Sequence, residues 1–136
     1  MRSCKQCSDA VHNRVAIYCS NKCQVDFQYA KYIEAWREGK ANGERGIITK
    51  GLSKHSRRYL IEKYGNSCTI CGWNEANPST GKVPVEVDHI DGNSENNLES
   101  NLRLICPNCH SLTSNFRNLN QGNGRQWRRI KYLRST

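Results

Sequence analysis

Residues 101–110 read NLRLICPNCH, and this stretch holds a short apolar run, two cysteines and a proline. The run LRLI predicts a β-strand. Pro107 predicts the first turn of a helix, which we expect to reach about Asn118, because proline has a helical φ and the N–H that it lacks is not needed there. Cys106 and Cys109 have the Cys-x2-Cys spacing of a metal-binding knuckle. The stretch therefore predicts a strand and a helix joined at a metal ion.

A second knuckle, Cys68-x2-Cys71, can complete that metal site. Between the two knuckles lies VEVDHIDG, residues 85–92, inside an apolar run from Val83 to Ile90 that predicts another strand. Two strands separated by a polar segment indicate a β-hairpin with a long connection. Four cysteines saturate a tetrahedral zinc ion.

His110 directly follows Cys109, so it could be mistaken for a zinc ligand. Neighbouring side chains on a helix point about 100° apart. His110 and Cys109 therefore do not easily bind the same metal, and we assign His110 to a different site.

The N-terminal segment contains another set of four cysteines, with the pattern Cys-x2-Cys-x11-Cys-x3-Cys. This is zinc-finger spacing, and the ligands are Cys4, Cys7, Cys19 and Cys23. Disulfides or buried thiols are the alternative, but disulfides do not persist in a reducing cytosol. We expect two structural Zn2+ ions that supply stability which a small core cannot.

Two helices are predicted upstream of the hairpin. Val25, Tyr29, Ile33 and Trp36 form a helical stripe that Gly39 closes. Ser53 can cap a second helix, at 54–64, which Gly65 would end. On the second helix we expect an inward face and an outer face. The inward residues are Leu60, Ile61 and Tyr64, and the outer ones are Arg57 and Arg58.

The expected fold class is α+β, a small zinc-stabilised core preceded by a zinc finger and helix. We expect a finger with its helix at 1–38, a linker at 39–52, the core at 53–118 and a basic tail at 119–136. The mean hydropathy is −0.82. The sequence has no apolar run of membrane length and no secretory h-region, so we predict a soluble, cytoplasmic protein without a membrane partner.

Charge is distributed unevenly along the chain, whose formal net charge is +9. Residues 40–63 carry seven Lys and Arg against two Glu, and residues 117–136 carry six and no acid. Residues 74–101 carry one Lys against six Asp and Glu. The excess of basic residues indicates a nucleic-acid partner. The acidic segment between the basic ones would repel phosphate unless it held a divalent cation.

Together these motifs resemble the HNH endonuclease superfamily, whose core is a ββα-metal hairpin and helix. The resemblance rests on Cys-x2-Cys, Asp88-His89, Asn101 in NLRLICPNCH, and His110. It extends to YCSNKC, RRYLIEKYG and CGW, as in small phage-type HNH enzymes with an N-terminal zinc finger.

The resemblance implies a role for each motif residue. His89 would be the general base, Asn101 would help to orient it, and Asp88 with His110 would bind a catalytic Mg2+ or Mn2+ ion. Imidazole titrates near neutral pH, as a base for phosphodiester hydrolysis must. Because successive strand side chains point to opposite faces, Asp88 and His89 can share a site only where the strand ends or twists.

The predicted function is a metal-dependent DNA endonuclease, phage or mobile-element encoded and of homing type or acting on phage DNA. The partner would be double-stranded DNA, and the oligomeric state, monomer or dimer, stays open. Expected DNA contacts are Arg57, Arg58, Arg117, Arg125, Arg128, Arg129, Lys131 and Arg134. The alternatives are a catalytically inactive zinc-dependent DNA-binding module and an RNA-directed nuclease.

Overall fold

The computed structural model describes residues 2–45, 51–116 and 119. Its internal contacts divide the chain into two units, one ending at Ala41 and the other beginning at Asn42. Of the expected DNA contacts, Arg117, Arg125, Arg128, Arg129, Lys131 and Arg134 lie outside the described residues. No helix in the described ranges is both long enough and apolar enough to cross a bilayer.

The N-terminal unit consists of a small hairpin followed by one helix. Strands β1 (Arg2–Ser3) and β2 (Ala10–Val11) pair antiparallel. They were not predicted, because two-residue strands are too short to show alternation. Ser20 caps the N-terminus of helix α1 (Asn21–Arg37), and its Oγ accepts the N–H of Cys23 at 3.2 Å. The predicted helix is thus confirmed, and Gly39 beyond it has the positive φ, 79°, of a helix stop.

Only the second half of the apolar stripe on α1 is buried. Ile33 is 9% exposed and Trp36 3%, whereas Val25 is 49% exposed. Val25 thus belongs to the predicted stripe but is not buried. Its part of the helix begins immediately after the knuckle residue Cys23, and a unit of this size has too little apolar surface to cover the whole stripe.

The second unit is built on an antiparallel hairpin. Strand β3 (Glu86–His89) pairs with β4 (Leu102–Ile105), Glu86 opposite Ile105 and His89 opposite Leu102. A 3-10 turn, η1 (Glu99–Asn101), leads into β4. The predicted hairpin and its long connection are confirmed. β3 is shorter than the run from Val83, because β4 offers only four partners and Pro84 has no N–H to donate.

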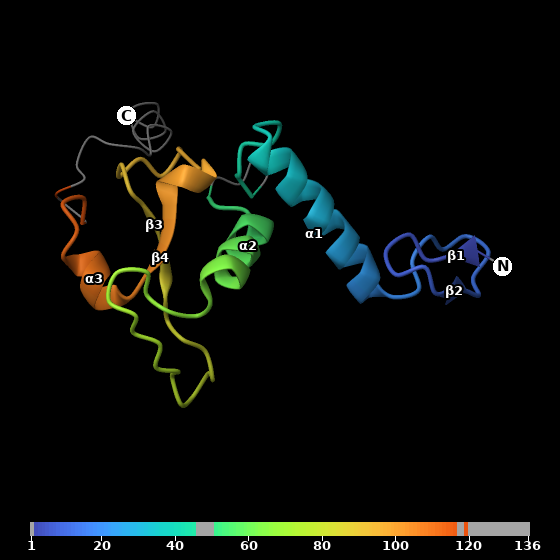
Figure 1. Cartoon of the computed structure of the whole chain (residues 1–136), viewed down its shortest axis with the longest axis horizontal. Helices are drawn as coiled ribbons and strands as arrows, with labels where there is room; N and C mark the ends of the chain where they lie inside the picture. The colour runs from blue at the N-terminus through green and yellow to red at the C-terminus, as the bar shows by residue number, and fades with distance from the viewer. Residues whose placement is uncertain (1, 46–50, 117–118, 120–136) are drawn as a thin grey trace, which may run out of the picture. The chain divides into compact units, whose positions relative to one another are not determined.

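Helix α2 (Lys54–Tyr64) matches the predicted helix. Ser53 Oγ accepts the N–H groups of His55 and Ser56 at 3.1 and 3.4 Å, and Gly65 ends the helix with φ 73°. Leu60 is fully buried as expected, but Tyr64 is 37% exposed, so its inward assignment was wrong. α2 contacts β4, and Figure 1 shows the hairpin between α2 and α3.

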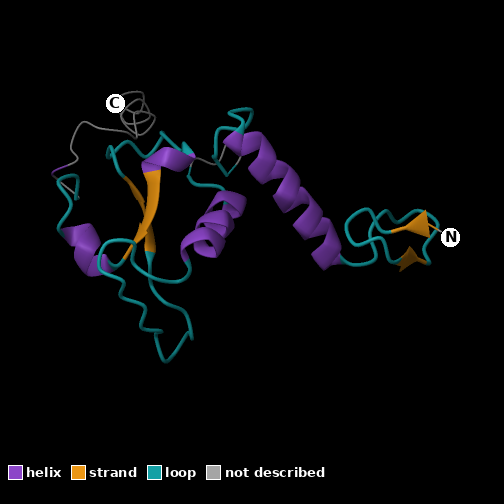
Figure 2. Ribbon diagram, in the orientation of Figure 1, coloured by secondary structure: helices purple, strands orange, loops and turns teal. Residues whose placement is uncertain are grey.

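Helix α3 (Pro107–Ser111) starts at the predicted proline but is much shorter than expected. Figure 2 shows a loop after this short helix. Two hydroxyl groups donate hydrogen bonds to backbone carbonyl oxygens at the end of the helix. Ser111 Oγ donates to Asn108 O at 2.7 Å, and Thr113 Oγ1 donates to His110 O at 2.9 Å. Such side-chain bonds compete with helical ones. With its small sheets and separate helices, the fold is of the α+β class, as predicted.

Candidate active site and cysteine clusters

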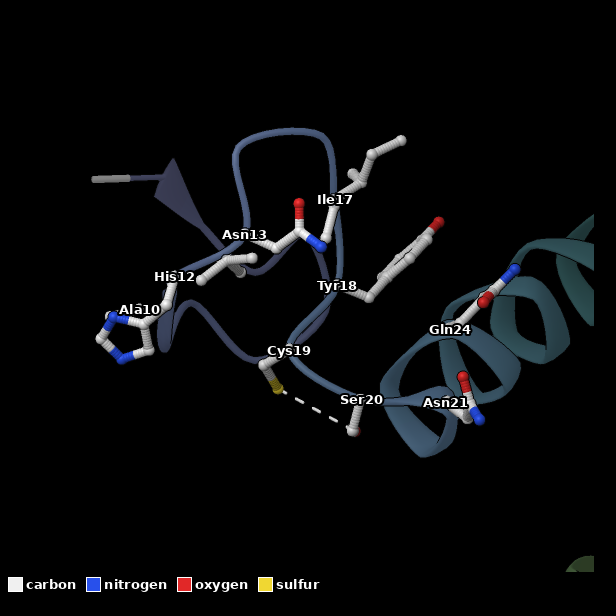
Figure 3. A pocket seen from close by; sticks show the side chains of 11 residues that line it. Ala10, His12, Asn13, Ile17, Tyr18, Cys19, Ser20, Asn21 and Gln24 are labelled. Atoms are coloured by element: carbon white, nitrogen blue, oxygen red, sulfur yellow. Dashed lines mark hydrogen bonds between the residues drawn. The ribbon is translucent and has the colours of Figure 1, made fainter.

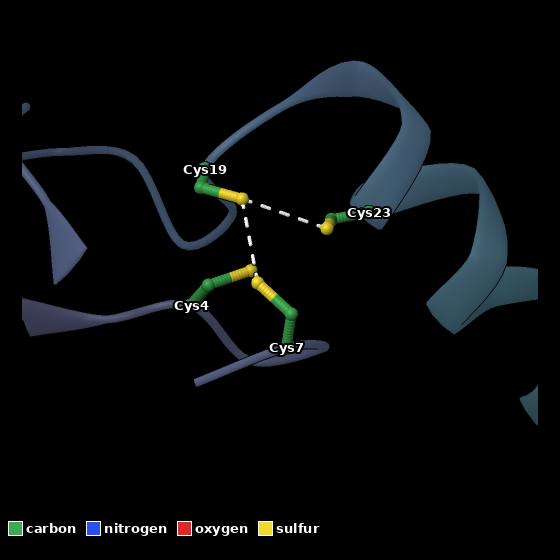
Figure 4. A group of neighbouring side chains, drawn as sticks. All are labelled: Cys4, Cys7, Cys19 and Cys23. Carbon is green, nitrogen blue, oxygen red and sulfur yellow. Dashed lines mark hydrogen bonds between the residues drawn. The ribbon is translucent and has the colours of Figure 1, made fainter. Parts of the chain in front are cut away.

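Both sets of four cysteines converge. In each set the four Sγ atoms lie within 4.8 Å of one another. Cys7 and Cys19 Sγ are 3.5 Å apart, as are Cys19 and Cys23 Sγ (Figure 4). A disulfide bond is about 2.05 Å long, whereas two sulfurs bound to one zinc at about 2.3 Å in a tetrahedron lie about 3.8 Å apart. The spacing therefore fits a shared metal ion and excludes disulfides, and all eight cysteines are free.

The second cluster, Cys68, Cys71, Cys106 and Cys109, joins the hairpin to α3. Cys106 Sγ lies 3.7 Å from Cys71 Sγ and accepts the N–H of Cys109 at 3.4 Å. Cys68 and Cys106 belong to one buried core with Ile105, against which Trp73 packs. Metal binding at this cluster would therefore hold β4 and the start of α3 together.

Ionisation of the cysteines differs within the second cluster. Burial raises the pKa of the Cys68 thiol, but hydrogen bonds from peptide N–H groups lower it by more. The largest of these comes from Cys71, and the net pKa is about 6. Burial, together with the sulfur of Cys106, raises the pKa of Cys109 to about 12. Without a cation, one thiolate thus opposes ionisation of the next. A bound divalent ion removes this conflict, so the donor set fits a metal.

His110 on α3 faces two carboxylates of β3. Its Nδ1 bonds Glu86 Oε2, and its Nε2 lies 3.9 Å from Asp88 Oδ1. Glu86 and Asp88 are two residues apart, so they share one face of the strand. A distance of 3.9 Å is too long for a hydrogen bond, but two ligands each about 2.1 Å from one Mg2+ can be separated by up to about 4.2 Å. The pair could therefore hold a divalent cation.

Asp88 is buried, and Arg103 balances its charge. Arg103 Nε donates to Asp88 Oδ2 at 2.8 Å, while Oδ1 is the oxygen that faces His110. These two residues are directly opposite in the hairpin register. Asp88 is 6% exposed, so an unpaired carboxylate here would be costly. The cross-strand pair fixes the orientation of the carboxylate.

His89 is the last residue of β3. Its Nε2 lies 2.8 Å from Asn97 Oδ1. An amide oxygen can only accept, so this contact requires a proton on Nε2, and in the neutral ring with that proton Nδ1 has the lone pair that can accept another. His89 and His110 both line a pocket of about 430 Å³. Because β3 ends here, neighbouring Asp88 and His89 can serve one region from opposite faces.

Asn101 is buried and closes the loop that follows His89. Its Nδ2 donates to Asp91 Oδ1 and to Asn96 O, both at 2.9 Å, and its Oδ1 accepts the N–H of Asp91 at 3.0 Å. The side-chain amide of Asn96, followed by other donors including Asn101, lowers the pKa of Asp91. Asn101 thus shapes the backbone next to His89, while the ring itself is bonded by Asn97.

Sequence reasoning missed Glu86, Asn97 and Arg103. Alternation along VEVDHIDG places Glu86 on the same face as Asp88, so that residue was detectable. Arg103 needed the strand register. No sequence pattern singles out Asn97, because Asn93 and Asn96 lie in the same loop. Asn97 differs from them by its burial, since only 3% of it is exposed.

The two adjacent arginines on α2 have different surroundings. Arg57 lines the pocket of His89 and His110, and its Nη2 donates to Val85 O at 3.5 Å. Arg58 Nε instead bonds Glu62 Oε1 at 2.9 Å. Both were expected on the outer side of the helix, but Arg57 faces the pocket.

The N-terminal unit has a pocket of its own, of about 590 Å³ (Figure 3). It is lined by His12, Asn13, Tyr18, Cys19 and Gln24 among others, with no carboxylate. It therefore lacks a counterpart of Glu86, the carboxylate that lines the other pocket together with His89 and His110.

Comparison with known proteins agrees with this geometry. The model of the HNH endonuclease family matches residues 68–116. The chain is 36% identical over 99 residues to H-N-H endonuclease F-TflIV of Escherichia phage T5, and the match covers 73% of this chain and 40% of that relative. The chain thus spans less than half the length of the relative. No solved structure matches significantly.

Proposed function

The chain belongs to the HNH endonuclease superfamily, and from its site geometry we propose that it is a metal-dependent DNA endonuclease that hydrolyses phosphodiester bonds. The observation that carries the proposal is the convergence of His89 and His110 on one pocket, with Asp88 Oδ1 3.9 Å from His110 Nε2. A base and a cation-binding pair at one surface are what phosphodiester hydrolysis requires.

In the proposed mechanism His89 takes a proton from the attacking water at Nδ1. Asn97 supports this role because it holds the proton on Nε2. Asn101 orients the base indirectly, through its bonds to Asp91 and Asn96. The ring of His89 is thereby kept in one tautomer and one orientation, as an efficient base needs.

Asp88 and His110 would hold the catalytic Mg2+ or Mn2+. Glu86 supports this assignment, since a metal-binding histidine commonly donates its other ring N–H to a carboxylate. The bound ion would stabilise negative charge that develops on the phosphate oxygens. Two further ions, structural Zn2+, would occupy the two cysteine clusters.

We further propose that double-stranded DNA is the substrate and that the N-terminal cluster unit helps to bind it. Similarity to a phage protein supports a phage or mobile-element origin, with a homing role or action on phage DNA. Arg57, Arg58 and the basic residues after position 116 would contact phosphates. The protein would then act in the cytoplasm of the host cell.

Incubation of supercoiled plasmid with the zinc-loaded protein tests the proposal. We expect nicked or linear products with Mg2+ or Mn2+, carrying 5′-phosphate and 3′-hydroxyl ends, and no products without a divalent ion. Intact plasmid under all conditions, combined with tight DNA binding, would instead identify an inactive DNA-binding module. Cleavage of RNA but not of duplex DNA would contradict the proposed substrate.

A further inference from the structure

Three basic side chains line the pocket of His89 and His110. They are Arg45, Lys54 and Arg57. The proposed mechanism assigns no role to Arg45 or Lys54, and a substrate phosphate must be held against the base. The basic segment before the hairpin and the acidic hairpin itself thus meet at this pocket.

Helix geometry explains which cations face the pocket. Lys54 and Arg57 are three residues apart on α2, so they lie on one face of the helix. The bond from Arg57 Nη2 to Val85 O, at 3.5 Å, holds the guanidinium beside the residue that precedes β3. Arg58 points about 100° away, toward its bond with Glu62.

The charges of these three side chains are not neutralised by ion pairs in the described part of the protein. Among the described residues, no carboxylate forms an ion pair with Arg45, Lys54 or Arg57. Glu86 lines the same pocket, but its carboxylate bonds His110. The cations are exposed, whereas Asp88, whose carboxylate bonds Arg103 and faces His110, is buried. The mouth of the pocket therefore presents positive charge to an incoming polyanion.

We propose that Arg45, Lys54 and Arg57 bind backbone phosphates of DNA at this pocket, and that Arg57 positions the scissile phosphodiester against His89. The proposal rests on the proposed function and deepens it. A planar guanidinium can bind a phosphate through two parallel hydrogen bonds, which fixes orientation as well as charge. A base can act only within hydrogen-bond reach of the water that it activates.

Salt-dependent DNA binding tests the phosphate contacts. Fluorescence anisotropy with a short duplex, in buffer without added divalent ions, gives the slope of log K against log salt. Arg45→Ala, Lys54→Ala and Arg57→Ala should each flatten the slope by about 0.9. The matched control is Lys82→Ala, which removes one exposed charge outside the pocket. Slopes equal to that of Lys82→Ala for all three variants would overturn the proposal.

Arg57→Lys tests positioning separately, because it keeps the charge but loses the planar fork. We expect the salt slope of wild type and a single-turnover cleavage rate lowered by about tenfold or more. A rate equal to wild type would overturn the positioning role. Unchanged zinc content and melting temperature would exclude a folding defect.

Plasmid cleavage and salt-dependent binding distinguish the proposed activity from the proposed phosphate contacts. If the wild-type protein cleaves no DNA with Mg2+ or Mn2+, the proposed function fails, and the salt slopes still decide whether these cations bind phosphate. If wild type cleaves and the slopes of the variants match Lys82→Ala, the function stands and the phosphate contacts are refuted.

Discussion

The two cysteine clusters have the same ligands and nearly the same sulfur spacing, yet their surroundings differ. The N-terminal cluster is formed by loops beside two-residue strands and by the first turn of α1, and two of its cysteines, Cys7 and Cys19, are exposed. The second cluster includes buried Cys68 and Cys106, which pack with Ile105, and its last cysteine precedes His110. Equal metal chemistry can thus stabilise one small unit in the first case and position a candidate active site in the second.

Removal of one ligand from each cluster should separate these roles and have the largest effect. Cys68→Ser should lose one zinc, lower the melting temperature strongly and abolish cleavage, because the cluster ties β4 to α3. Cys19→Ser should also lose one zinc and weaken DNA binding, but retain cleavage at saturating protein. Zinc content by metal analysis, melting curves and plasmid cleavage measure the three effects. Equal loss of cleavage in both variants would contradict the distinction.

A smaller effect is expected from Glu86→Gln. This variant tests whether the second cluster positions His110 for a contact that supports metal binding. An amide is a weaker partner for His110 Nδ1, and loss of such outer contacts typically costs about 10- to 100-fold in metal affinity or activity. Titration of cleavage with Mn2+ measures the shift. Glu95→Gln is the matched control, since Glu95 is exposed and outside the pocket. Identical Mn2+ curves for the two variants would remove Glu86 from the site.

Asn101→Ala should have a moderate effect on stability in the second unit. The substitution removes the hydrogen bonds of Asn101 to Asp91 and Asn96. It should lower the free energy of unfolding by about 1–3 kcal/mol, which urea unfolding measures. The lowered pKa of Asp91 adds a pH dependence: its contribution is present above the ordinary carboxyl pKa and is lost as the pH falls through the lowered value. Asn101→Ala should weaken this acid sensitivity. An unchanged acid profile would show that Asn101 does not hold the loop.

The smallest effect on cleavage is expected from removing residues 119–136, whose basic side chains lie outside the motif. If three of them contact phosphates, the slope of log K against log salt should flatten by roughly 3 units. Single-turnover cleavage at saturating protein should change little, because Asp88, His89, Asn101 and His110 remain. A truncated protein with the slope of wild type would show that this segment does not bind DNA.

The sequence predicted the features that depend on local chemistry. Ser53 and Gly65 set both ends of α2, and the cysteine spacings predicted both clusters. The features that it could not predict depend on register, burial or competition. Arg103 was found only through its position opposite Asp88, and Asn97 only through its burial. The early end of α3 follows from hydroxyl bonds at Ser111 and Thr113, which no hydrophobic period reveals.

The most direct test of the proposed active site compares single-turnover plasmid cleavage by wild type and His89→Ala, with Mg2+ and with both proteins saturating the DNA. The substitution removes the proposed base but no proposed metal ligand. We therefore predict loss of cleavage with zinc content, melting temperature and DNA affinity near those of wild type. Rapid cleavage by His89→Ala would contradict the assignment of His89 as the base and, with it, the proposed active site.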